Sequence, residues 1–282
     1  VYGWIAGYGQ EPEYYVLGIE AAGKVIGDPN YRLVASPEEV CTEVLPGNSE
    51  EGIFEVCYDD SRGEYKDFGS YIGGTVEKWP VLKGTTPASR RKFFIRNETV
   101  ESLYTPEDLR LQAYFADFFR MKEEPVSVTQ GAAYVRMWRE VEYYSGGIYD
   151  GTPRTLLAND ILIRLPDILL LRAEMKAATG DREGAVADLD VVRRRAGVDG
   201  YSEAEGDLRR AIQLERDREL LFQTGVRYFD YMRNHTYNLL KGGFRDLTET
   251  DVAAGALFLP VSLDAMNNSP KVKQSAYWVG KF

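Results

Sequence analysis

Aromatic side chains stand beside short polar groups in two stretches of this sequence that lack regular periodicity. The 282 residues include 19 tyrosines and 4 tryptophans. An aromatic ring offers an apolar face for the C–H bonds of a sugar ring, and neighbouring polar groups can hydrogen-bond its hydroxyls. The candidate ligand-binding residues are Tyr65, Asp67, Tyr71, Trp79, Arg90, Tyr144 and Tyr149. The pattern predicts a sugar-binding site, and the alternative is that these rings merely anchor their loops.

Other kinds of site find little support, so we expect no catalytic residue, metal or cofactor. The single histidine, His235, follows a predicted helix, where a cap or surface role suits it better than a Ser-His-Asp triad. Cys41 and Cys57 match no zinc-ligand spacing and are expected to be two separate thiols. A glycoside hydrolase, the rival hypothesis, needs two carboxylates about 5–10 Å apart. Among 44 acidic residues no local pattern isolates such a pair.

Charge and hydropathy exclude two further classes of partner. The formal net charge of −10 repels a polyanion, so nucleic acid is not an expected ligand. No apolar run reaches the roughly 18 residues that a membrane-spanning helix needs. The longest such run, around Ile161 to Leu171, is interrupted by Arg164, Pro166 and Asp167.

Helical hairpins are the elements expected to position the loops. Apolar residues recur at helical spacing over Glu13 to Ile26, and again from Ile161 to Lys176 and from Ala185 to Ala196. The last two helices, joined at Gly180-Asp181, resemble a tetratricopeptide-type hairpin. One hairpin cannot bury its apolar face alone, so the helical segment near the chain start is expected to pack against it.

Two loop regions separate these helices. The first loop region, Asp59 to Arg96, and the second loop region, Tyr143 to Thr155, are rich in glycine and tyrosine, as binding loops often are. A strand is expected over Glu51 to Tyr58, and an aromatic helix should open at a Thr105 cap. The predicted fold class is mainly α, with helical hairpins, long irregular loops and a few short strands.

Spaced motifs in the second half of the chain identify a family resemblance. The motifs are Arg164–Glu174 (RLPDILLLRAE), Val192–Gly197 (VRRRAG), Glu215–Arg233 (ERDRELLFQTGVRYFDYMR), Leu257–Val261 (LFLPV) and Asn268–Tyr277 (NSPKVKQSAY). In this order they resemble the motifs of the SusD/RagB family. Pro166 stands where the family usually has Ala, and Gln223 where it usually has Glu. Charged motif positions such as Glu215, Glu219, Arg216, Arg227 and Asp230 are expected to pair with one another as scaffold.

The resemblance implies a fold and a function. It implies one SusD-like domain, an α–α superhelix, of which the N-terminal part is expected to be missing. The domain comprises a helical segment with a strand (residues 1–58), a loop-rich ligand-binding region (residues 59–158) and a C-terminal helical region (residues 159–282). It implies non-catalytic glycan binding on the bacterial outer membrane, through a lipid anchor upstream of Val1, and delivery to a SusC-like TonB-dependent porin. An interaction scaffold that docks on the porin with a non-glycan nutrient is the alternative.

Overall fold

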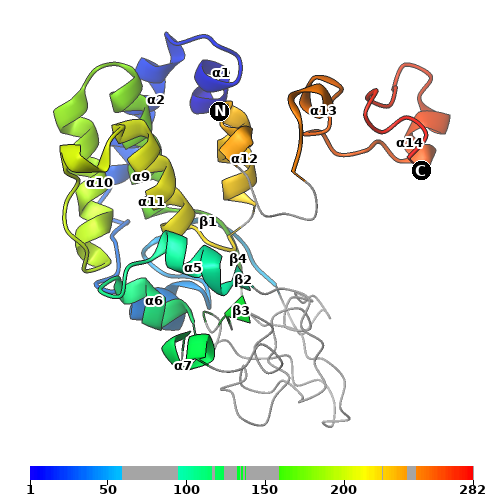
Figure 1. Cartoon of the computed structure of the whole chain (residues 1–282). Coiled ribbons are helices and arrows are strands. Elements are labelled where there is room, and N and C mark those ends of the chain that lie inside the picture. The colour runs from blue at the N-terminus through cyan, green and yellow to red at the C-terminus, as the bar shows by residue number, and fades with distance from the viewer. Residues whose placement is uncertain are drawn as a thin grey trace.

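Helices dominate the computed structural model of the chain, which describes residues 1–58, 95–115, 118–123, 132–133, 135, 137, 159–223, 225–239 and 246–281 (Figure 1). The helices are α1 (Tyr2–Gly7), α2 (Tyr14–Ile26), α3 (Pro37–Glu39), α5 (Asn97–Leu103), α6 (Leu109–Tyr114), α7 (Phe118–Glu123), α9 (Leu165–Ala178), α10 (Arg182–Arg195), α11 (Leu208–Glu219), α12 (Val226–Arg233), α13 (Glu249–Ala253) and α14 (Leu263–Asn268). A π-helical turn, Val40–Val44, extends α3, and 3-10 turns occupy Glu203–Glu205 and Tyr237–Leu239. The strands are β1 (Gly52–Val56), β2 (Ile95–Arg96), β3 (Ala132–Ala133) and β4 (Asp160–Arg164).

The antiparallel hairpin of α9 and α10 forms the centre of the helical body, as predicted. Gly180, with φ at +88°, turns the chain, and the Asp181 carboxylate caps α10 by accepting from the Gly184 N–H at 3.0 Å. Ala173 and Ala185 are fully buried between the helices and belong to one apolar core with residues of α11. The mainly α fold built from helical hairpins is therefore confirmed.

The helix near the chain start packs on this hairpin, which confirms the neighbour that the sequence required. Figure 1 shows α2 beside α9, and residues of both share a core that contains Tyr15, Ala22 and Met175. Gly18 lets the two helices approach closely, because a methyl group at this position would overlap the Met175 sulfur. One layer of packed helices thus runs from α2 through α9 to α10 and α11.

Two predicted helix starts are wrong. The segment Asp160–Arg164 is β4, and the helix begins only at Leu165, because Pro166 occupies its first turn and cannot stand in a helix interior. Ile161 and Ile163 instead pair with Glu55 and Phe54 of β1.

The other wrong start is the Thr105 cap. The helix α6 begins at Leu109, where the Asp108 carboxylate accepts from the Arg110 N–H at 2.9 Å. Tyr114, Phe115 and Phe118 are buried in a second apolar core as expected of this aromatic segment, whereas Phe119 is half-exposed.

Residues 246–281, here called the C-terminal lobe, carry α13 and α14 and stand apart from the other helices in Figure 1. The Tyr228 hydroxyl of α12 donates a hydrogen bond to the Leu257 carbonyl and so joins the helical body to the lobe. Within the lobe the Tyr277 N–H donates to the Ala254 carbonyl at 2.8 Å. None of the helices in the described ranges is long and apolar enough to cross a bilayer.

Candidate functional site

The seven residues predicted to bind a ligand lie outside the described residues. Tyr65, Asp67, Tyr71, Trp79 and Arg90 fall in the first loop region, and Tyr144 and Tyr149 in the second. Their roles therefore stay predictions, and the structure describes the frame from which the two loop regions start.

Short strand pairs join the stems of the two loop regions. β1, which leads into the first loop region, pairs antiparallel with β4, which follows the second, so that Val56 lies opposite Asp160. β2, at the end of the first loop region, pairs antiparallel with β3, so that Ile95 lies opposite Ala133. The four stems gather at one end of the helical body (Figure 1). The first loop region therefore leaves beside Asp160, which follows the second loop region, and returns beside Ala133, which precedes it.

Polar side chains tie the β1–β4 stem together. The Glu55 carboxylate accepts hydrogen bonds from the Asn48 N–H at 2.8 Å and from the Asn159 side-chain amide at 2.7 Å. The Tyr58 hydroxyl donates to Asp160 at 3.3 Å. Burial and the neighbouring Asp160 charge raise the pKa of Tyr58, so its hydroxyl keeps its proton. The contacts of Glu55 with Asn159 and of Tyr58 with Asp160 join residues more than 100 positions apart, and they hold the start of the first loop region beside the end of the second.

Buried ion pairs anchor the other end of this strand pair to the helices. Arg164, the last residue of β4, bonds Glu51 at 2.6 Å and Glu219 at the end of α11 at 2.7 Å. Arg195, the last residue of α10, also pairs with both carboxylates, with Glu51 at 2.8 Å. Arg110 of α6 reaches Glu219 at 3.3 Å. All five side chains are buried, so the strands that carry the loop stems are locked to three helices.

The electrostatics of this cluster keep the Glu219 carboxylate ionised. Burial alone would raise the pKa of Glu219, but the charges of Arg195, Arg164 and Arg110 outweigh burial and hold the pKa at about 2. A carboxylate held this way cannot release and take up a proton near neutral pH as a general acid must. The cluster is therefore suited to hold the scaffold rather than to perform acid–base chemistry.

A second buried cluster confirms that the charged motif positions pair as scaffold. Arg216 of α11 bonds Asp230 of α12 at 2.5 Å and Asp167 of α9 at 2.6 Å. Arg233 pairs with Glu174 of α9 and, at 2.8 Å, with Asp230. These contacts join α9, α11 and α12 of the helical body.

The remaining chemically reactive side chains lie apart from one another. Cys41 is buried and donates to the Ala113 carbonyl at 3.6 Å, whereas Cys57 is exposed, so the two thiols are separate as predicted. His235 follows the C-cap residue of α12 and stacks on Tyr8 with ring centroids 5.5 Å apart. Within the described ranges, no three His, Cys, Asp or Glu side chains gather as a metal site would require.

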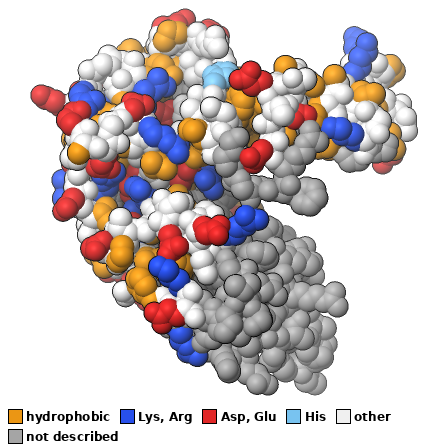
Figure 2. Space-filling view, viewed as in Figure 1, with side chains coloured by type: hydrophobic (Ala, Val, Ile, Leu, Met, Phe, Trp, Pro, Cys, Tyr) orange, Lys and Arg blue, Asp and Glu red, His pale blue; other side chains and the backbone are white. Residues whose placement is uncertain are grey.

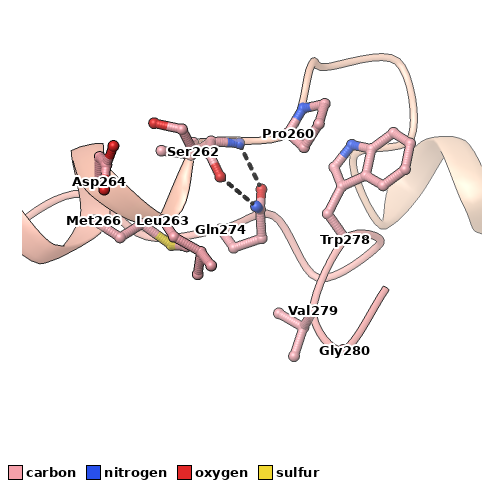
Figure 3. A pocket seen from close by; sticks show the side chains of 10 residues that line it. Pro260, Ser262, Leu263, Asp264, Met266, Gln274, Trp278, Val279 and Gly280 are labelled. Carbon is pink, nitrogen blue, oxygen red and sulfur yellow. Dashed lines mark hydrogen bonds between the residues drawn. The ribbon is translucent and has the colours of Figure 1, made fainter. Parts of the chain in front are cut away.

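The C-terminal lobe contains a pocket of about 590 Å³ that sequence reasoning missed (Figure 3). Trp278 and Pro260 lie toward one end of it, and the apolar side chains of Leu263 and Met266 toward the other. The pocket is mainly apolar. The available sequence signal in this region was Gln274, which belongs to the last family-like motif. That motif indicates a turn near the end of the matched region, but it does not indicate a pocket.

Two polar side chains of this pocket, Gln274 and Trp278, bond to the chain's own backbone. The Gln274 amide accepts from the Val261 N–H at 3.1 Å and donates to the Val261 carbonyl at 3.0 Å, as the dashed lines show (Figure 3). The Trp278 indole N–H donates to the Phe258 carbonyl at 2.7 Å. With these donors and acceptors occupied, the pocket is better suited to an apolar partner than to a sugar with many hydroxyls.

Comparison with known proteins supplies the family. The family model described as the SusD family matches residues 50–278. No curated protein matches the chain.

Solved structures share the fold. A SusD homologue from Bacteroides thetaiotaomicron superimposes with a TM-score of 0.78 at 22% identity, over 98% of this chain and 57% of that one. Surface glycan-binding protein A from Bacteroides uniformis gives a TM-score of 0.71 at 19% identity, over 98% and 60%. Surface glycan-binding protein A from Bacteroides thetaiotaomicron, in complex with laminarihexaose, gives 0.66 at 18% identity, over 98% and 62%. The chain thus spans about three fifths of the length of these structures.

Proposed function

Because this chain belongs to the SusD family, we propose that it binds an oligosaccharide, without transforming it, between the two loop regions. The observation that carries the proposal is the pairing of the loop stems, β1 with β4 and β2 with β3. This pairing places the two ends of the first loop region beside strands that precede and follow the second, and the two regions hold Tyr71, Trp79 and Tyr144 among their aromatic residues. A sugar stacked on rings from both segments would bury more surface than one held by either segment alone.

The location and the delivery step belong to the same proposal. We place the protein at the surface of a bacterial outer membrane, held by an N-terminal lipid anchor, and we propose that it passes its ligand to a SusC-like TonB-dependent porin. The likeness to solved surface glycan-binding proteins, one of them in complex with laminarihexaose, supports the glycan as ligand. The Glu219 carboxylate, held ionised by its arginine partners, is consistent with binding without catalysis.

Isothermal titration calorimetry against a panel of oligosaccharides that includes laminarihexaose tests the proposal. We expect one class of glycan to bind, and Trp79→Ala and Tyr71→Ala each to weaken its binding at least tenfold, because one stacked ring contributes about 1.4 kcal/mol. Tyr8→Ala is the matched control, since Tyr8 is an exposed tyrosine that caps α1, and α1 lies at the end of the helical body away from the four strands (Figure 1).

Two results would contradict the proposal. One is a folded protein, as judged by circular dichroism, that binds no member of the panel. The other is a glycan whose affinity falls equally in the Tyr8→Ala control, because the loss would then not be specific to the loop regions.

The exposed apolar surface of the C-terminal lobe favours a second role, docking on a protein partner such as the porin. Leu259, Leu263 and Val279 are 85%, 63% and 66% exposed, and apolar side chains lie on the surface of this lobe (Figure 2). Leu263→Asp should abolish co-purification with the porin while glycan affinity stays unchanged. Unaltered co-purification would exclude this surface as the docking site.

A further inference from the structure

A cavity of about 970 Å³ lies next to the stem of the first loop region and is separate from the pocket of the C-terminal lobe. Its walls come from β2, α5, α11 and α12, and apolar side chains such as Leu214 and Leu221 line part of it. The polar and charged side chains in its wall include Arg96, Thr99, Ser102, Arg210, Gln223 and Arg227. The volume lies near the upper end of the range of about 300–1,000 Å³ that small-molecule sites occupy.

The charge of this cavity is one-sided. Three arginines and no aspartate or glutamate are among its described lining residues. Arg227 pairs with Asp217 at 3.3 Å, but within the described part of the chain neither Arg96 nor Arg210 has a carboxylate partner. Among the described residues, Arg96 and Arg210 therefore form no salt bridge, although Asp217, the partner of Arg227, also interacts with the charge of Arg210.

Arg210 is held in place and still has donors to spare. Its guanidinium lies over the Tyr231 ring at 6.0 Å, and Arg227 lies over the same ring at 5.5 Å. Arg210 donates two long hydrogen bonds of 3.4 Å, to the Gln213 side chain and to the Tyr231 hydroxyl. That hydroxyl in turn donates to Asp217 at 2.6 Å, which fixes the ring. A guanidinium carries five N–H donors, so most of those on Arg210 can bind a ligand.

A carboxylate is the group that such a site recognises best, because a guanidinium binds it through two parallel hydrogen bonds. The cavity is too large for a simple anion, and hydroxyl groups and leucines stand beside the arginines, as a sugar ring requires. We propose that this cavity binds an acidic sugar residue, a uronic acid, with its carboxylate on Arg210 and Arg96. This proposal rests on the proposed function, which makes the ligand a sugar. The cavity adjoins the proposed sugar site because Arg96 is the last residue of the first loop region.

Titration of sodium glucuronate, followed by saturation-transfer NMR and calorimetry, tests this inference. Glucose and inorganic phosphate are the comparison probes. We expect glucuronate to bind and glucose not to bind at the same concentration, and Arg96→Gln and Arg210→Gln each to weaken glucuronate at least tenfold. Arg209→Gln is the matched control: Arg209 is the neighbour of Arg210 on α11, is exposed and lines no part of this cavity.

Several results would overturn the inference. These are no binding of glucuronate to the folded protein, equal binding of glucose, complete displacement of glucuronate by an equal concentration of phosphate, or the same loss in Arg209→Gln. The failure of this inference differs from a failure of the proposed function. If neutral glycans bind through Trp79 but glucuronate does not bind, the inference alone fails. If glucuronate binds through the two arginines but no glycan depends on Trp79, the loop site alone fails.

Discussion

Replacing Glu219 by glutamine should destabilise the protein more than any comparable change at its surface. This carboxylate is fully buried and lies among Arg110, Arg164 and Arg195. Glutamine keeps the size of the side chain but removes its charge, so three guanidinium groups lose a shared counter-ion inside the protein. Breaking a buried pair in this way typically costs about 3–5 kcal/mol.

The pKa of Glu219 gives an independent estimate of the same quantity. The difference between its folded value of about 2 and the usual 4.5, at about 1.4 kcal/mol per pKa unit, corresponds to about 3–4 kcal/mol of stability. Because the folded pKa is the lower one, this contribution is fully present above about pH 4.5 and is lost as the pH falls through about 2. The stability difference between wild type and Glu219→Gln should therefore shrink across this window.

Urea denaturation followed by circular dichroism at pH 7 and at pH 3.5 measures both effects. With a slope of about 3 kcal/mol per molar urea, the midpoint at pH 7 should fall by about 1 M in Glu219→Gln. Glu203→Gln is the matched control, because Glu203 also pairs with an arginine, Arg182, but does so at the surface; its midpoint should stay close to that of wild type. Equal midpoints for the two variants, or a deficit in Glu219→Gln that is as large at pH 3.5 as at pH 7, would refute the reasoning.

Three further predictions concern other parts of the structure. Exposed Cys57 should react with a maleimide in the native protein, whereas buried Cys41 should react only after unfolding, as mass spectrometry of labelled peptides would show. Gln274→Leu should remove both hydrogen bonds to Val261 and destabilise the C-terminal lobe by about 1–3 kcal/mol, measured as faster amide exchange there than in α9. Leu189→Ala should lower stability by about 2–5 kcal/mol in urea denaturation, because this fully buried side chain fills the core of the central hairpin.

Local patterns predicted the helices well and their first residues less well. The spacing of Ala173, Ala185 and Leu189 gave the central hairpin, because both helices and their turn lie within one short segment. The same periodicity wrongly placed the start of the first helix at Ile161. The apolar residues of β4 alternate as in a strand, but over so few positions they also fit helical spacing. Pro166 carried the information that corrects this start.

Long-range partners were beyond the reach of sequence patterns. That charged motif residues pair could be expected from their types, but Arg164 and Glu51 stand 113 positions apart, and nothing local identifies them as partners. The pairing of β2 with β3 is likewise set by tertiary structure, since a strand of two residues has no periodicity to detect. The seven loop residues remain predictions, and Trp278 was missed because its pocket forms only when residues 260–266 meet residues 274–280.

The residues that identify the family and those proposed to bind the ligand serve different physical purposes. Motif residues such as Arg164, Arg195 and Glu219 are buried in shared ion pairs, where losing one partner leaves the others uncompensated. Solved structures share this fold at 22% identity or less. The β1–β4 stem of the loop regions is held by this network. It follows that substitutions in the network should alter stability, whereas substitutions at Tyr71 or Trp79 should alter affinity.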